Sequence, residues 1–127
     1  MAVRALLDSD VLIDFLRGRP DAVAFLSNLQ ARPLVSVVTV AELFAGVREG
    51  SERASLETFL RSSVTVEVDE GMATRAGLLL PQYRKSHGMG LADALIAAAA
   101  EVSGASLVTL NAKHFPMLTN IVVPYTK

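Results

Sequence analysis

Short apolar runs alternate along the chain with stretches in which apolar residues recur every three or four positions. The short runs favour strands, and they lie at 3–7, 33–37, 64–68, 106–110 and 120–124. The helical spacings lie at about 9–16, 20–29, 40–50, 56–60, 72–83 and 91–102. Strands that alternate with helices pair in parallel, with helices on both faces of the sheet. The pattern therefore predicts an α/β fold, and its continuity over residues 1–127 predicts a single domain.

Two of the predicted helices have unusual sequences. Pro81 lies inside the apolar spacing of the helix at 72–83, and a proline there predicts a kink or an early stop. The helix at 91–102, "LADALIAAAAEV", has almost no polar face, which predicts that it is buried.

Polar residues follow the predicted strands. Asp8 directly follows the first strand, and Glu42 lies about one helical turn beyond the second. Asp93 is in the first turn of the predicted buried helix, and Asn111 follows the strand at 106–110. In sheets of this kind, ligands bind just beyond the carboxyl ends of the strands. We therefore expect these four side chains to surround one point, with further polar residues beside them at Ser9, Asp10, Thr39 and Thr109.

Three carboxylates at one point predict a cation. Without one, their mutual repulsion raises at least one pKa, so that a carboxyl group takes up a proton. Mg²⁺ prefers one or two carboxylates together with water and phosphate oxygens. Such a site activates water and neutralises the charge that builds on a phosphoryl group. On this interpretation Asp8 is a metal ligand.

Each acid also has a structural interpretation. Asp8 could close a turn, and Asp10 could be a helix N-cap. Asp14 lies four residues after Asp10, and we expect it to be solvated or paired with Arg17. Asp93 could be a first-turn acid that faces the helix dipole. The coincidence of the acids at strand ends, rather than any one residue, supports the functional interpretation.

The same alternatives apply to the remaining candidates. By helical periodicity, Glu42 lies opposite the apolar stripe of its helix, which is typical of a surface glutamate. Thr109 and Asn111 could be turn residues. His87 lies in a glycine-rich break and is expected to be solvated, whereas His114 is a candidate for either a phosphate contact or a plain surface role.

Composition narrows the possible classes. The chain is 51 % hydrophobic over 127 residues and has no cysteine, which excludes disulfides and thiolate metal sites. The net charge is −1, so any contact with nucleic acid must come from a local basic patch. No segment resembles a signal peptide, and the apolar stretches are too short to span a membrane. We therefore expect a soluble, cytoplasmic protein with no membrane association.

Four segments carry a resemblance to a known family. They are "LLDSDVLIDFL", "VSVVTVAELFAG", "LADALIAAAA" and "LVTLNAKHFPML", and they follow one another in this order along nearly the whole chain. Together they resemble the PIN-domain ribonucleases, in particular the VapC-type toxins of bacterial toxin–antitoxin modules. The resemblance implies a three-layer α/β/α domain with a central parallel sheet, and cleavage of RNA with Mg²⁺ or Mn²⁺.

The resemblance also assigns roles to residues. Asp8, Glu42 and Asp93 match the family's metal-binding acids. The fourth position, often an acid, is Asn111 here, which implies a weaker second metal and makes Asp10 a candidate for the missing charge. Three further matches fall on polar positions that line the family's site, namely Ser9, Thr39 and Thr109.

The implied partners are RNA, a small antitoxin protein and a second copy of the chain in a homodimer. The candidates for RNA phosphate contact are Arg17, Arg19, Arg48, Arg84, Lys85, Lys113 and His114. An antitoxin helix is expected in an apolar groove between two helices. Its walls are expected to be formed by Val11, Leu12, Phe15 and Leu16 and by Leu56, Phe59 and Leu60.

Two other functions fit parts of the sequence. "DSDV" after a strand also resembles the start of the haloacid dehalogenase-type phosphotransferases, with Asp8 as nucleophile and Asp10 as general acid. The later acidic pair of that family is missing, and the chain is short for it. The other alternative is a catalytically weak PIN-like protein that only binds partners, with Asn111 as the sign of lost activity.

Overall fold

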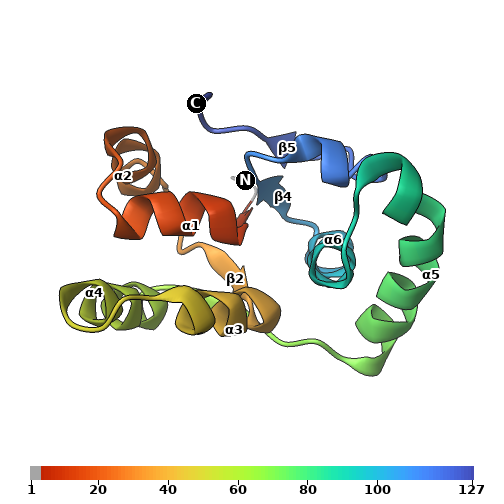
Figure 1. Cartoon of the computed structure of the whole chain (residues 1–127), viewed down its shortest axis with the longest axis horizontal. Helices are drawn as coiled ribbons and strands as arrows, with labels where there is room; N and C mark the ends of the chain where they lie inside the picture. The colour runs from red at the N-terminus through yellow and green to blue at the C-terminus, as the bar shows by residue number, and fades with distance from the viewer. Residues whose placement is uncertain (1–3) are drawn as a thin grey trace.

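The computed structural model describes residues 4–127, so that Val3 of the first predicted strand lies outside the described residues (Figure 1). The strands are β1 (Ala5–Leu7), β2 (Leu34–Ser36), β3 (Val64–Val66), β4 (Ser106–Val108) and β5 (Ile121–Val122). The helices are α1 (Ser9–Leu16), α2 (Pro20–Ser27), α3 (Val37–Gly46), α4 (Ser51–Arg61), α5 (Glu70–His87), α6 (Leu91–Ser103) and the short 3₁₀ helix η1 (Ala112–His114).

The strands form one parallel sheet in the order β3-β2-β1-β4-β5. β1 lies at its centre, pairing with β2 through Leu6 and Leu34 and with β4 through Leu6 and Leu107. Since neighbouring strands run in the same direction, their carboxyl ends meet at one edge. This edge is where the sequence predicts the functional residues.

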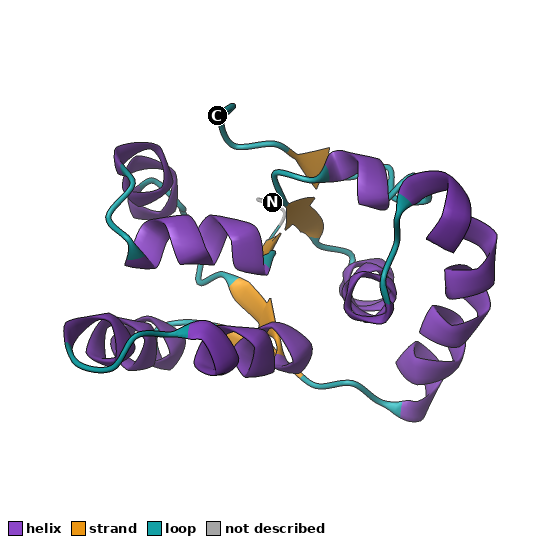
Figure 2. Cartoon of the chain, viewed as in Figure 1, coloured by secondary structure: helices purple, strands orange, loops and turns teal. Residues whose placement is uncertain are grey.

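Alternate residues of the central strands face two separate cores, which produces three layers (Figure 2). Leu6 and Leu107 pack against α5 and α6, whereas Leu7 and Val108 pack on the other face against α1, α3 and α4. Figure 1 shows α1–α4 on one side of the sheet and α5 and α6 on the other. The predicted three-layer α/β/α fold is confirmed.

Helix α6 is the most deeply packed helix of the fold, as its sequence predicts. Ala94, Ala97, Ala98 and Ala99 are fully buried, because small side chains allow α6 to lie close to the sheet on one side and α5 on the other. Within residues 4–127, no helix is long and apolar enough to cross a membrane.

The structure corrects three details. Pro81 does not stop α5, which continues to His87 and ends at Gly88, where φ is +66°. Pro81 is exposed, so water can bind the carbonyl that its missing N–H leaves free. The helix predicted at 40–50 begins earlier, at Val37, because the buried Ser36 caps it by accepting a hydrogen bond from the Val38 N–H. Phe44, assigned to the apolar stripe of that helix, is 39 % exposed.

Candidate active site

Asp8 lies at the carboxyl end of β1 and is the N-cap of α1. Its side chain is buried, with Oδ1 accepting a hydrogen bond from the Ser9 N–H at 2.8 Å and Oδ2 accepting one from the Thr109 hydroxyl at 2.8 Å. Burial, followed by the negative charge of Asp10, raises the pKa of Asp8 to about 7 despite these two hydrogen bonds. Asp8 therefore does close a turn, but as a buried carboxylate that forms no ion pair with any residue of the range 4–127.

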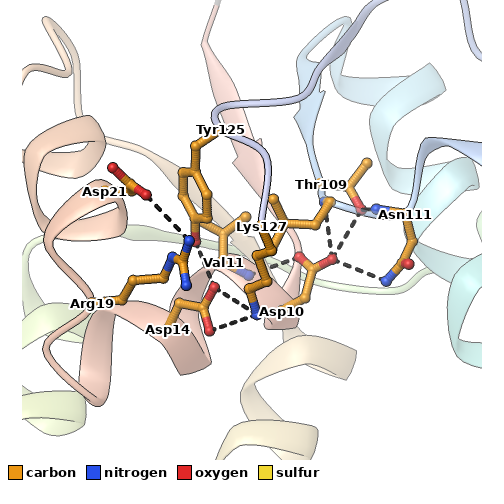
Figure 3. A network of polar contacts seen from close by, with 10 residues as sticks. Asp10, Val11, Asp14, Arg19, Asp21, Thr109, Asn111, Tyr125 and Lys127 are labelled. Carbon is orange, nitrogen blue, oxygen red and sulfur yellow. Dashed lines mark hydrogen bonds and ion pairs between the residues drawn. The ribbon is translucent and has the colours of Figure 1, made fainter.

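The Asp10 carboxylate fastens the loop after β4 to α1. Its Oδ2 accepts hydrogen bonds from the Leu110 N–H at 2.9 Å and the Asn111 amide at 3.1 Å, while Oδ1 accepts from the Val11 N–H at 2.7 Å (Figure 3). Asp10 is therefore not the N-cap of α1, since Asp8 fills that role. Asp10 thus accepts these three hydrogen bonds, against two for Asp8, so fewer of its lone pairs remain for a cation.

Asp93 lies in the first turn of α6, as predicted, and it has two contacts. Its Oδ2 accepts a hydrogen bond from the Gly90 N–H at 3.0 Å, which is the helix-capping role open to a first-turn acid. The same oxygen lies 3.4 Å from Nδ1 of His114, which is half-buried. His114 therefore lies beside a carboxylate in this structure rather than free to contact a phosphate.

Glu42 is exposed on α3, yet the charge of another acid of the site affects its pKa. Partial burial and the charge of Asp93 raise the pKa of Glu42, while the Ser9 hydroxyl acts in the opposite direction. Asp93 also contributes to the raised pKa of Asp8. Asp93 is therefore close enough to influence both Asp8 and Glu42, whereas Asn111 faces Asp10 and is only indirectly connected to these acids.

Across residues 4–127, no three Asp, Glu or His side chains already converge in a closed metal site. Two threonines predicted to line the site, Thr39 and Thr109, are fully buried. Thr109 donates to Asp8 and its hydroxyl accepts the Asn111 N–H at 3.0 Å, whereas the Thr39 hydroxyl has no partner. The buried Asp8 carboxylate is therefore held in place by the Ser9 N–H and the Thr109 hydroxyl.

The candidate phosphate contacts are spread over several surfaces. Arg17 is exposed at the end of α1 and shares a small pocket with Glu42, and Arg48 and Lys113 are also exposed. Arg19 is already occupied, since it pairs with Asp21 at 3.2 Å. The remaining two, Arg84 and Lys85, are exposed in the last turn of α5.

Sequence analysis missed the role of the last residues of the chain. The Tyr125 hydroxyl donates to Asp14 at 2.7 Å, and the Lys127 ammonium lies 3.0 Å from the same carboxylate (Figure 3). The predicted partner of Asp14, Arg17, is wrong, because the tail rather than the next helical turn supplies the cation. The residues after β5 have neither apolar periodicity nor a motif, so only the three-dimensional structure reveals this contact.

The antitoxin groove predicted between two helices is only partly available. Val11, Leu12 and Leu56 are buried in the core and cannot contact a partner. Phe15 of α1 and Phe59 of α4 remain half-buried with ring centroids 5.3 Å apart, and they line a shallow pocket of about 490 Å³.

Comparison with known proteins agrees with this fold. The PIN-domain profile matches residues 5–117. The chain is 42 % identical to Ribonuclease VapC19 of Mycobacterium tuberculosis, over 94 % of this chain and 98 % of the relative, and 44 % identical to Ribonuclease VapC10 of the same species, over 94 % and 92 %. A toxin–antitoxin complex from Klebsiella pneumoniae contains a chain with the same fold, with a TM-score of 0.82, 27 % identity and coverage of 97 % of this chain and 99 % of that one. The PIN match excludes the haloacid dehalogenase alternative, and the chain belongs to the PIN-domain family, among its VapC-type members.

Proposed function

We propose that this protein is a metal-dependent endoribonuclease, the toxin of a VapBC-type toxin–antitoxin module, and that it hydrolyses RNA at Asp8, Glu42 and Asp93. The observation that carries the proposal is Asp8, a buried carboxylate at the carboxyl end of the central strand whose pKa is raised to about 7. The names of the relatives, ribonucleases of the VapC type, support the same reaction. Action on RNA implies a cytoplasmic location.

The residues fit a hard divalent cation in their chemistry. Asp8, Glu42 and Asp93 offer carboxylate oxygens, which Mg²⁺ and Mn²⁺ prefer. Burial, followed by the charges of neighbouring acids, raises the pKa values of Asp8 and Glu42, and a cation would offset both causes. An open Mg²⁺ site needs only one or two carboxylates, with water and phosphate oxygens filling the remaining positions. A closed cluster of three ligands is therefore not required before substrate binds.

In the proposed reaction, each residue of the site has a separate task. Asp8 would hold the cation with oxygens oriented in advance by the Ser9 N–H and the Thr109 hydroxyl. Glu42 and Asp93 would complete the negative charge around it. When bound, the cation lowers the pKa of a water molecule and neutralises charge on the phosphate that this water attacks. The exposed Arg17, from its pocket beside Glu42, would attract the RNA backbone.

Asn111 favours a site with one tightly bound metal ion over a site with two metal ions of equal affinity. Its amide nitrogen donates to Asp10, so only the neutral carbonyl oxygen remains for a ligand. A neutral oxygen binds a divalent cation more weakly than a carboxylate does. We therefore expect one main cation at Asp8, Glu42 and Asp93, and a weak or empty position beside Asn111.

We also propose that an antitoxin helix binds at the pocket between Phe15 and Phe59. The complex from Klebsiella pneumoniae, a toxin–antitoxin complex of the same fold, supports a protein partner. Two half-buried aromatic rings beside a shallow pocket suit the helix-in-groove mode of binding. A basic residue of the antitoxin could then reach the acids and compete with the metal.

The decisive test is cleavage of RNA by the purified protein with Mg²⁺ or Mn²⁺, and again after chelation of the metal. We expect cleavage that requires the metal and that is lost in Asp8→Asn. Glu57→Gln, which neutralises an exposed acid in the middle of α4, is the matched control and should cleave normally. RNA binding without cleavage by the metal-loaded parent would instead favour the PIN-like protein that only binds partners.

The partner is tested with the small protein encoded next to this one. We expect it to bind and to inhibit cleavage, and Phe15→Asp to weaken that binding while the variant remains folded. Unchanged binding in folded Phe15→Asp would move the interface elsewhere on the surface. Failure of any adjacent protein to bind would remove the toxin assignment without removing the nuclease.

A further inference from the structure

A cleft next to the candidate active site has no role in the reaction proposed above. It has a volume of about 330 Å³ and lies between the tail after β5 and the loop after β4. Asp10 and Asn111 line one wall, and Val123, Tyr125, Thr126 and Lys127 line the other. This volume is at the small end of the range for ligand clefts, roughly 300–1,000 Å³.

The tail wall of the cleft is held in a fixed position. The Tyr125 hydroxyl donates to Asp14 at 2.7 Å, and the Arg19 guanidinium lies over the Tyr125 ring, 5.2 Å from its centroid (Figure 3). Lys127 adds an ion pair with the same carboxylate at 3.0 Å. An aromatic ring fixed by these contacts can bind a ligand with little loss of conformational entropy.

The opposite wall offers polar groups in known positions. Asp10 holds the Asn111 amide nitrogen, so the carbonyl oxygen of Asn111 is fixed as an acceptor, and within residues 4–127 no donor occupies it. Thr126 is exposed and contributes a hydroxyl that can donate or accept. The cleft therefore combines an aromatic wall with hydrogen-bonding groups.

The charges of the cleft argue against a phosphate ligand. Lys127 is the cation of the lining, and it is already paired with Asp14, while Asp10 adds a negative charge. Val123 is apolar and 47 % exposed beside Tyr125. Apolar and aromatic walls with hydrogen-bonding groups and little net charge suit a flat, neutral heterocycle, and unpaired RNA bases are recognised by such surfaces.

We propose that this cleft binds one unpaired nucleobase of the RNA strand, next to the phosphate that is cleaved. The inference rests on the proposed ribonuclease function and adds a base subsite to it. A chain of hydrogen bonds connects the subsite to the acids. The Asn111 side chain donates to Asp10, and its backbone N–H donates to the Thr109 hydroxyl. That hydroxyl donates in turn to Asp8. Val123, Tyr125 and Thr126 would then influence which RNA sequences are cut.

The test uses the full chain carrying Asp8→Asn, which binds RNA without cutting it, and a short single-stranded RNA of a sequence that the parent protein cleaves. Each nucleotide in turn is replaced by an abasic one, and binding is measured by fluorescence anisotropy. We expect removal of one base near the cleavage position to weaken binding roughly tenfold, the loss typical of a stacked base. In a protein that also carries Thr126→Leu, which narrows the cleft without changing charge, the same removal should cost less than about twofold.

Thr65→Leu is the matched control, because Thr65 is an exposed threonine on β3, at the opposite edge of the sheet. It should leave the abasic pattern unchanged. An identical abasic pattern in the Thr126→Leu and Thr65→Leu proteins, both folded by circular dichroism, would overturn the base subsite even if the parent cleaves RNA. A Thr126→Leu protein that loses antitoxin binding while keeping the parental abasic pattern would overturn it as well.

Failure of the ribonuclease function gives a different result. In that case the parent cuts no RNA, and binding is scanned on an uncut oligonucleotide instead. A base-dependent loss that disappears with Thr126→Leu would then support the cleft as a base site of an RNA-binding protein, and its absence would overturn the cleft as well.

Discussion

Asp8 lies at the start of α1 and Asp14 lies within it, and their environments shift their pKa values in opposite directions. Burial and the charge of Asp10 raise the pKa of Asp8 to about 7. Burial also tends to raise the pKa of Asp14, but hydrogen bonds from Tyr125 and Lys127 and the charges of Lys127 and Arg19 outweigh it, so that this pKa is lowered. The difference lies in the cation, which the protein supplies to Asp14 from its own tail and does not supply to Asp8.

This comparison separates a structural acid from a functional one. An acid that is paired inside the protein stabilises the fold in its ionised form, whereas a buried acid without a cation destabilises it. Such a cost is typical of functional sites, where a ligand offsets it. The four predictions that follow test this separation.

The largest expected effect is on catalysis. Asp8→Asn should lower the rate of RNA cleavage at least about a hundredfold, because it removes the central negative charge of the site. Asp14→Asn should lower that rate by less than about tenfold, since Asp14 acts on the site only through the tail that it holds. Initial rates with Mn²⁺ measure both. Equal losses in the two variants would break the distinction between the two acids.

The second effect is the pH dependence of stability without metal. The folded protein holds the Asp8 proton up to a pH of about 7, while the unfolded chain releases it near 3.8. Between these values the native state binds more protons, so its free energy of unfolding falls as pH rises, by at most about 4 kcal/mol. Urea titrations at several pH values should show a clearly larger fall in the parent than in Asp8→Asn, which keeps the smaller contributions of Asp10 and Glu42.

Metal should reverse that dependence. A cation that binds ionised Asp8 stabilises the native state most above pH 7, where the proton is already lost. When a chelator removes the metal at pH 8, the buried Asp8 is ionised without a cation. Asp8→Asn should then be at least as stable as the parent. Marked destabilisation of Asp8→Asn under those conditions would mean that Asp8 is purely structural.

The third effect is a smaller change in stability, and here the substitution destabilises the protein. Asp14→Asn should lower the free energy of unfolding at neutral pH by about 1–2 kcal/mol, because the Tyr125 hydroxyl and Lys127 lose a charged acceptor. Since the pKa of Asp14 is lowered in the folded protein, its contribution is present above the unfolded pKa and is lost as pH falls through the folded pKa. The parent and Asp14→Asn should converge in strong acid.

The smallest expected effect concerns the number of metals. Calorimetry with Mn²⁺ should give one main site, with affinity roughly tenfold lower in Asp93→Asn. Two equally tight sites in the parent would contradict a weak position at Asn111. Unchanged affinity in Asp93→Asn would remove Asp93 from the ligands and leave it as the capping acid of α6.

Much of the fold could be predicted from the sequence, because secondary structure depends largely on residues that are close together in the chain. Alternation of short apolar runs and helical spacings predicted the parallel sheet, and strand ends predicted the position of Asp8 and Thr109. The early stop allowed at Pro81 was wrong, because the cost of a missing N–H depends on whether water reaches the helix at that point. Val11 and Leu12 were assigned to a partner surface, but burial on a helix depends on which neighbours cover it.

The site was less predictable because its contacts join distant parts of the chain. Asp10 was considered as an N-cap or a spare charge, and it instead holds Leu110 and Asn111. Asp14 was assigned to Arg17, its sequence neighbour, and it instead binds Tyr125 and Lys127. Periodicity describes one element at a time, so it contains no information on which side chain of another element reaches an acid.

The bond from the Thr109 hydroxyl to Asp8 spans 101 positions of sequence and has a consequence for synthesis on the ribosome. β1 is made early, but its neighbour β4 and the loop that holds Asp10 are made only near the end. A growing chain therefore lacks the donors that orient these acids until almost all of it has emerged. If the protein cuts RNA, its own messenger and ribosome are protected from it until translation is nearly complete.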